Sequence, residues 1–114
     1  MLTVYIASPY TKGDPQENTD KSFDCALDLI GAGFAPYAPL YSHYLHLRRP
    51  QNYHVWTALD LIWVLKCDAL LRLPGESSGA DAEVKFAQEN NIPVFYSVAE
   101  LIEWKNSTER INYV

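Results

Sequence analysis

The sequence predicts an α/β domain, in which a mainly parallel, four- to five-stranded sheet lies between two layers of helices. Three observations carry this prediction. Short apolar runs rich in β-forming residues alternate along the chain with longer runs of helical spacing. Glycine, proline or a helix-capping residue marks each change of element. The 114 residues are enough for a single domain over 1–114, and nearly half of them are apolar.

Four short apolar runs, each bounded by turn residues, are the expected strands. They are Leu2–Ala7, Phe34–Tyr37, Asp68–Leu73 and Asn91–Tyr96. We place the first run at the centre of the sheet, because the chain begins with it. The tail, Arg110–Val114, is open to two interpretations: a fifth strand, or an arm that contacts a partner.

Helices are expected between these runs and after the last of them. In the first helix Asp14 is the N-cap and Pro15 takes the first helical position, while Gly31 and Gly33 end it. The remaining helices are expected over residues 54–66, from 77 to about 90, and over 97–104. This alternation is typical of flavodoxin-like and Rossmann-like three-layer domains.

In such a domain, ligands bind at the carboxyl ends of the strands, near the point where strand order reverses. Two segments are expected at that edge. One is Ser8–Pro9–Tyr10, which follows the first strand, and the other is the loop Gly75–Gly79, which follows the third.

The loop after the third strand leads into a helix with one misplaced carboxylate. Ser77 and Ser78 can cap that helix, and Gly79 lets the backbone approach a ligand closely. Further on, Glu83 falls on the same helix face as an apolar stripe, while a favourable pair of opposite charges is expected on the outer face. The stripe is Ala80, Val84 and Ala87, and the outer pair is Asp81 with Lys85. An inward carboxylate is either paired, solvated in a cleft, or functional.

The helix over residues 54–66 is apolar nearly all round, which is typical of a helix buried on more than one side. In so small a domain, we expect a second copy of the chain to cover the outer side, as a homodimer or larger oligomer. Asp60 is the only charged residue between Val55 and Leu65. It is either an interface ion pair or the partner that Glu83 needs for acid–base chemistry.

Residues 38–52 predict a long irregular segment of the kind that often serves as a lid. His43 and His46 lie in it, and His54 follows closely. No fourth ligand stands nearby and the spacing matches no metal motif, so we expect neither a metal nor a cofactor. Arg48 and Arg49 are either an attraction for phosphate or a solvated basic pair.

Composition excludes several classes of partner. A net charge of −5 argues against nucleic acid, although a small anionic ligand remains compatible with it. No run is long and apolar enough for a membrane span, and the first residues do not form a signal peptide. Cys25 and Cys67 lie in apolar surroundings and indicate unpaired thiols in a reducing compartment. We therefore expect a cytoplasmic protein that binds a small molecule.

The chain resembles the nucleoside 2-deoxyribosyltransferase superfamily in order and spacing over nearly its whole length. The resemblance is carried by Val4–Pro9, by the aspartate in the middle helix, and by Ser77–Glu83. It is close to the 2′-deoxynucleoside 5′-monophosphate N-glycosidases. The stretch Pro39–His43 is similar to an uncharacterised phage and bacterial branch of the same superfamily.

The resemblance implies roles for individual residues. Glu83 matches the family's nucleophile, Asp60 its second catalytic acid, and Tyr5 the tyrosine that steadies the glutamate. It also implies a set of substrate-binding residues, which are Ser8, Pro9, His43, Ser77, Ser78 and Gly79. No cofactor is implied.

Position 77 implies the class of substrate. Family members that act on free nucleosides have an aspartate there, which binds the sugar's 5′ hydroxyl, whereas the monophosphate N-glycosidases have a serine, as in Ser77. A helix N-terminus with free amides and a hydroxyl suits a phosphate, which an aspartate would repel. We also expect the helix dipole to lower the pKa of Glu83.

One departure from the N-glycosidases concerns the turn after the first strand. It runs Ala7–Lys12 and contains no arginine, so Lys12, Arg48 or Arg49 would have to supply the positive charge. Two alternatives to an enzyme remain open. One is a nucleotide-binding module without turnover, and the other is a structural dimer whose acids are only interface ion pairs.

Overall fold

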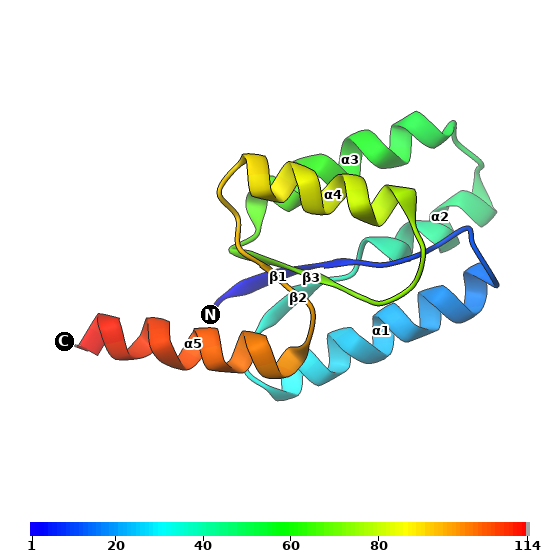
Figure 1. The fold of residues 1–114 in the computed structure, drawn as a ribbon. Helices are drawn as coiled ribbons and strands as arrows, with labels where there is room; N and C mark the ends of the chain where they lie inside the picture. The colour runs from blue at the N-terminus through cyan, green and yellow to red at the C-terminus, as the bar shows by residue number, and fades with distance from the viewer. Residues whose placement is uncertain (114) are drawn as a thin grey trace.

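The structure of the chain, a computed structural model, describes residues 1–113 and the side chains of residues 1–108. Strands and helices alternate through most of the chain (Figure 1). The elements are, in order, β1 (Thr3–Ala7), α1 (Pro15–Gly31), β2 (Ala35–Tyr37), the 3-10 turn η1 (Pro39–Tyr41), α2 (Ser42–Arg48), α3 (Tyr53–Lys66), β3 (Ala69–Arg72), α4 (Ser78–Glu89), β4 (Val94–Phe95) and α5 (Val98–Tyr113).

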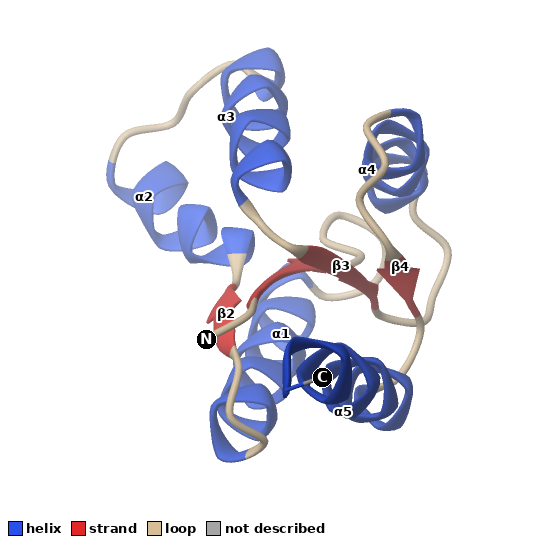
Figure 2. Ribbon diagram, turned by 90° about the vertical axis from the view of Figure 1, so that its left-hand side faces the viewer, coloured by secondary structure: helices blue, strands red, loops and turns tan. Residues whose placement is uncertain are grey.

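The four strands form one sheet in the order β2-β1-β3-β4, and every neighbouring pair is parallel. The prediction of an α/β, Rossmann-like three-layer fold is therefore confirmed, with β1 inside the sheet as expected. Helices α1 and α5 cover one face of the sheet, and α3 and α4 cover the other (Figure 2). Strand order reverses between β1 and β3, so their carboxyl ends form the edge at which a ligand is expected.

Alternation along β1 divides the core into two parts, because successive side chains of a strand point to opposite faces. Val4 and Ile6 pack toward α1 and α5, whereas Tyr5 and Ala7 pack toward α3 and α4. Tyr5 is fully buried, although its side chain carries a hydroxyl. That hydroxyl must find a partner on the α3–α4 side of the sheet.

The prediction of an irregular segment over residues 38–52 is wrong for two thirds of its length, because η1 and α2 occupy residues 39–48. Helix α2 has only 7 residues and no side-chain cap, so its local sequence provides little helical signal. Tertiary contacts stabilise it instead. Tyr44 stacks on Phe23 of α1, and His43 is buried against Tyr10.

Of the two interpretations of the tail, the fifth strand is wrong for residues 110–113, since α5 continues through Tyr113, and the arm that contacts a partner stays a prediction. Val114 lies outside the described residues. Ser97 caps this helix as expected, its Oγ accepting a hydrogen bond from the Glu100 amide at 3.1 Å. The helix simply runs on past Trp104, where the sequence-based prediction ended it.

Helix α3 has one covered side and one exposed side within a single chain. It contacts α4, but Val64 is its only fully buried apolar residue. The outward apolar side chains are Val55, Leu59, Ile62, Trp63 and Leu65, of which Ile62 is 52% exposed. The cover that we expect from a second copy stays a prediction.

Two smaller expectations concern cysteines and membranes. Cys25 and Cys67 are both free thiols, so the prediction that they form no disulfide is confirmed. Burial raises the pKa of each thiol to about 11. Within residues 1–113, no helix has the length and apolar character needed to cross a membrane.

Candidate active site at the carboxyl edge of the sheet

A cavity of about 400 Å³ opens at the carboxyl ends of β1 and β3, where the topology places a ligand site. Four parts of the chain line it. They are the loop after β1 (Ser8 and residues 10–12), the lid segment with η1 and α2 (residues 39, 40, 42 and 46), the first half of α3 (residues 53, 56, 57, 60 and 61) and the start of α4 with its preceding loop (residues 76–80, 82 and 83).

Helix α4 begins at this cavity with the cap that the sequence predicts. The Ser77 Oγ accepts a hydrogen bond from the Ala80 amide at 3.0 Å. Ser77, Ser78 and Gly79 all line the cavity. A Cβ atom at Gly79 would stand 3.5 Å from the Tyr53 hydroxyl, and would therefore take up space between α3 and α4. The helix start thus presents amides and hydroxyls to an open space, which is favourable for an anion.

Glu83 also lines the cavity, one and a half turns further along α4. The buried Tyr5 hydroxyl donates a hydrogen bond to the Glu83 carboxylate, which satisfies the polar group that β1 brings into the core. Burial, followed by the nearby Glu83 charge, raises the pKa of Tyr5 well above its usual range. Tyr5 therefore stays protonated and acts as a permanent donor that orients the carboxylate.

The expected lowering of the Glu83 pKa by the helix dipole is wrong. Burial raises the pKa of Glu83 to about 8, the charge of Asp60 adds to this rise, and the Tyr5 hydrogen bond and Arg72 oppose it. The dipole acts mainly on the first turn of a helix, and Glu83 lies beyond the first turn of α4. Desolvation therefore dominates at this position.

Asp60 projects from α3 into the same cavity. Burial raises the pKa of Asp60 to about 7. Among the residues whose side chains the structure describes, Asp60 forms no ion pair. The two carboxyl groups that the sequence singled out therefore face one space, each with a pKa close to neutrality.

Arg72 is a neighbour of this site that sequence reasoning missed. It is the last residue of β3 and only 9% exposed, and it pairs with Asp81 on α4 at 2.8 Å. The predicted pairing of Asp81 with Lys85 is thus replaced by a contact across elements, and Lys85 lies 4.0 Å from Glu89 instead. Because its charge lowers the pKa of Glu83, Arg72 favours the ionised carboxylate. The sequence did contain a signal for this residue, because Arg72 is a charged residue inside an otherwise apolar strand.

The remaining predicted binding residues divide into two groups. Ser8 lines the cavity and donates a hydrogen bond to the Pro9 carbonyl oxygen at 3.0 Å. Pro9 is not part of the lining and packs against Gly75, whose positive φ of 118° suits the tight turn there. His43 is also outside the lining.

His43 is held on both sides by other residues. Its Nδ1 lies 2.7 Å from the Tyr10 hydroxyl, and its Nε2 lies 3.3 Å from the Gln16 Oε1. The buried ring therefore joins α2 to α1 and to the loop after β1. His43 thus holds Tyr10, which does line the cavity, and its own role as a binding residue stays a prediction.

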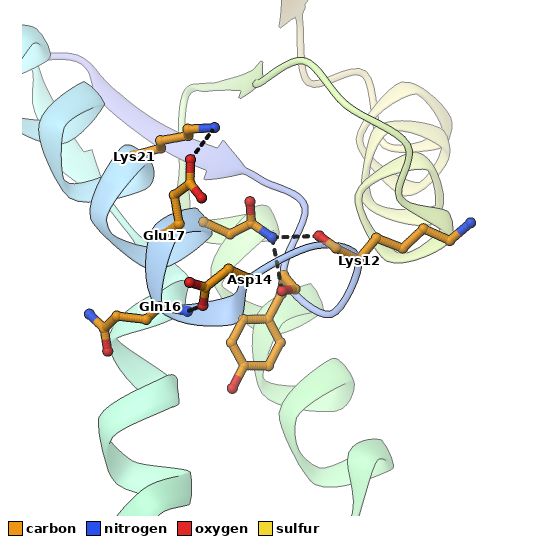
Figure 3. Close-up of polar contacts among 7 residues, drawn as sticks. Lys12, Asp14, Gln16, Glu17 and Lys21 are labelled. Atoms are coloured by element: carbon orange, nitrogen blue, oxygen red, sulfur yellow. Dashed lines mark hydrogen bonds and ion pairs between the residues drawn. The ribbon is translucent and has the colours of Figure 1, made fainter.

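The loop after β1 is fixed from α1. The Asn18 side-chain amide donates hydrogen bonds to the carbonyl oxygens of Tyr10 and Lys12, at 3.0 and 2.8 Å. Asp14 caps α1 by accepting from the Gln16 amide at 2.9 Å, and the Lys12 side chain extends away from α1 (Figure 3). Its ammonium reaches Glu76 at 2.8 Å.

Lys12 is the one lysine or arginine among the described residues that line the cavity; Arg48 and Arg49 are not in the lining. Of the three positive candidates for an anion, the structure therefore brings only Lys12 to the site. Aromatic side chains from α3 were also missed as lining residues, namely Tyr53 and Trp56. Tyr53, Trp56 and Asp60 are spaced three and four residues apart along α3, so they lie on the same face of the helix.

No group of three His, Cys, Asp or Glu side chains within the described residues is arranged to hold a metal ion. The three histidines of the lid region are instead engaged separately. His43 contacts Tyr10, and His46 contacts Trp56. His54 lies in the first turn of α3, beside Tyr53.

Comparison with known proteins gives a family but no activity. A search of curated proteins finds no match. Residues 2–97 match a family described as "Domain of unknown function (DUF7768)". The matched region contains every strand of the sheet and all the residues that line the cavity. The chain belongs to this family.

Proposed function

We propose that the protein cleaves the N-glycosidic bond of 2′-deoxynucleoside 5′-monophosphates, or exchanges their bases, with Glu83 as the nucleophile. One observation supports the proposal most strongly. A carboxylate oriented by a buried tyrosine and a second carboxyl group, each with a pKa near neutrality, line one cavity beside a helix N-terminus. The resemblance to the nucleoside 2-deoxyribosyltransferase superfamily supports the same assignment.

In the proposed first step, the ionised Glu83 attacks C1′ of the deoxyribose through an oxocarbenium-like transition state. Asp60 holds a proton and transfers it to the departing base as the C1′–N bond breaks. The products of this step are the free base and a deoxyribosyl ester of Glu83. Tyr5 donates to the Glu83 carboxylate, and so holds the attacking oxygen in one orientation.

In the second step, the Asp60 carboxylate accepts a proton from water or from a second base as that molecule attacks C1′. The ester bond to Glu83 breaks, and the Glu83 carboxylate is restored. Water as the acceptor gives 2-deoxyribose 5-phosphate, and a base as the acceptor gives a new nucleotide. The configuration at C1′ is retained over the two displacements.

The phosphate is proposed to bind at Ser77, Ser78 and Gly79. The free amides at the start of α4 and the two serine hydroxyls supply donors, and the helix dipole favours a negative charge there. Lys12 supplies a mobile positive charge, since its pair with Glu76 is exposed to solvent and can be exchanged for phosphate.

The decisive assay incubates the protein with each 2′-deoxynucleoside and its 5′-monophosphate, and detects free base by chromatography. We expect base release from monophosphates, and base exchange when a second base is present. Binding of the monophosphates with no release from any of them would contradict the enzyme and favour a nucleotide-binding module. If the protein neither binds nor cleaves any of these compounds, the two acids have no ligand-related role and the proposal is wrong.

The pH dependence of kcat/KM is expected to be bell-shaped, with its maximum between pH 7 and 8. The active form carries one proton between the two acids, on Asp60 and not on Glu83. Because Asp60 has the lower pKa of the two, this form is the minority of the singly protonated enzyme, and its share of that population does not change with pH. Below the pKa of Asp60, about 7, both groups are protonated and Glu83 cannot attack. Above the pKa of Glu83, about 8, both are ionised and the base cannot be protonated.

This profile is measured as initial rates of base release from pH 5 to 10. The substrate phosphate titrates near pH 6, below the expected maximum. A maximum below pH 5.5, as expected for carboxyl groups with ordinary pKa values, would contradict the assignment of these two buried acids.

Two further parts of the proposal concern the state of the protein. We expect the enzyme to be a homodimer or larger, because the outward side of α3 exposes a continuous set of large apolar side chains. We also place it in the cytoplasm, where free thiols such as Cys25 and Cys67 stay reduced.

A further inference from the structure

His46 on α2 lines the cavity but has no part in the proposed chemistry. Its Nδ1 is already engaged by two groups. The Trp56 indole Nε1 lies 2.9 Å from Nδ1, and the Gln51 backbone nitrogen lies 3.2 Å from it. Both of these groups are donors only, so Nδ1 must be the acceptor. In the neutral imidazole the proton then resides on Nε2.

The Nε2 of His46 takes no hydrogen-bond partner among the described residues. In this it differs from His43, whose two ring nitrogens both have partners within the chain. His46 is half-buried and belongs to the lining of the cavity. Its Nε2–H is therefore a donor of fixed tautomer that remains available to a bound molecule.

The position of α2 indicates which part of a ligand His46 would meet. Helices α2 and α4 lie on opposite sides of α3 (Figure 2). The start of α4 takes the phosphate in the proposed function, and Glu83 on α4 takes the sugar carbon. The base would then occupy the part of the cavity that η1 and α2 line. There Trp56 lines the cavity as an aromatic surface, and the same hydrogen bond to His46 holds its ring.

We propose that His46 and Trp56 form the base subsite, in which His46 donates its Nε2–H to an acceptor atom on the edge of the nucleobase and Trp56 contacts the base face. This inference rests on the proposed function for the identity of the ligand. The recognised chemistry is a flat heterocycle with an exposed carbonyl or ring-nitrogen acceptor. His46 is a specificity-determining residue in this scheme and takes no part in bond breaking.

The test compares two substitutions that each keep one edge of the imidazole. His46→Asn keeps an acceptor near the Nδ1 position, so it retains the partner of Trp56 but lacks the donor. His46→Gln places an amide nitrogen near the Nε2 position and retains the donor. The ligands are the 2′-deoxynucleoside 5′-monophosphates and, as the probe without a base, 2-deoxyribose 5-phosphate. Affinities are measured by calorimetry under conditions where turnover is followed in parallel.

We expect His46→Asn to bind at least one monophosphate about 3- to 10-fold more weakly than the wild type, the range of one neutral hydrogen bond. Its affinity for 2-deoxyribose 5-phosphate should be unchanged, and His46→Gln, which keeps the donor, should bind that monophosphate more tightly than His46→Asn does. Equal affinities of His46→Asn and the wild type for every monophosphate would overturn the inference. Equal weakening for 2-deoxyribose 5-phosphate would also overturn it, because a structural role would then explain the loss.

The tautomer provides a readout that is independent of any ligand. In 15N NMR at pH 8, we expect His46 to carry its proton on Nε2 and to leave Nδ1 unprotonated, and a proton on Nδ1 would overturn the inference. The two proposals can fail separately. If His46→Asn binds the monophosphates more weakly but the wild type releases no base, the base subsite is supported and the proposed enzymatic activity is contradicted. If the wild type releases base but His46→Asn binds as tightly as the wild type, the activity is supported and the subsite is contradicted.

Discussion

Replacement of Glu83 by glutamine is expected to lower kcat for base release by at least about 10³-fold, because the amide cannot form the glycosyl ester. The geometry of the site should survive. The glutamine oxygen can still accept the hydrogen bond that Tyr5 donates to the carboxylate. Asp60→Asn should lower kcat by about 10²- to 10⁴-fold, the usual range for a general acid. Rates are measured by chromatography of the released base at pH 7.5.

The same Glu83 substitution is expected to stabilise the folded protein at high pH. The pKa of Glu83 is raised from 4.5 to about 8 on folding, so the folded state binds more protons than the unfolded state between those values. The free energy of unfolding therefore falls as pH rises through this window, and the full cost of the buried charge is present above pH 8. Glutamine never ionises and escapes that cost, which is on the order of a few kcal/mol.

Urea denaturation at pH 4.5 and at pH 9 measures this effect. The free energy of unfolding of Glu83→Gln, relative to that of the wild type, should be much higher at pH 9 than at pH 4.5. Such a result, together with lost activity, separates a functional carboxylate from a structural one. If the variant loses both activity and stability at pH 9, Glu83 is a structural residue and the proposed chemistry is wrong.

Glu89→Gln is the matched control for this experiment. It makes the same change on the same helix, but Glu89 is exposed and lies 4.0 Å from Lys85 on the outer side of α4. An exposed pair of this kind contributes little to stability. The control should therefore retain both the activity and the stability of the wild type at either pH.

The second large effect is expected at Ser77, where aspartate should exchange one substrate class for the other. The aspartate can still cap α4, since aspartate and serine are comparably good N-cap residues. Its charge would face the phosphate at the helix start and repel it. We expect kcat/KM for monophosphates to fall about 100-fold or more. The value for free deoxynucleosides should rise, because the carboxylate can accept the 5′ hydroxyl.

Ser77→Asn is the matched control for the added charge. Asparagine has nearly the shape of aspartate and caps helices equally well, but it is neutral. Monophosphate use by this variant should stay within a few fold of the wild type. Equal kcat/KM for monophosphates in Ser77→Asp and Ser77→Asn would refute phosphate binding at the start of α4 and leave the glycosidic chemistry untouched.

Local patterns were sufficient to predict the sheet and most of its helices. The N-caps Asp14, Ser77 and Ser97 each form the hydrogen bond that their side chains imply. Caps and alternating apolar runs act over a few residues, so they can be read directly from the chain. Helix α2 could not be found in this way, because contacts from distant residues such as Phe23 stabilise it.

The candidate site could be predicted where a residue broke a local pattern. Glu83 in an apolar stripe and Asp60 in an apolar helix are such exceptions, and both line the cavity. Lys12 was only one of three candidates for the positive charge, and His46 and Trp56 carried no distinguishing signal. Their roles depend on which side chains the lid brings against α3, and that arrangement has no local pattern.

What the sequence determined by itself is the three-layer fold and the two acids at the carboxyl edge of its sheet. What only the tertiary structure decided is the electrostatic state of those acids and the rest of the lining. The helix dipole predicted a lowered pKa for Glu83, and burial between α3, α4 and the sheet raises it. The physical reason is that desolvation depends on everything packed around a group. Position in a helix, by contrast, is a local property that the chain itself records.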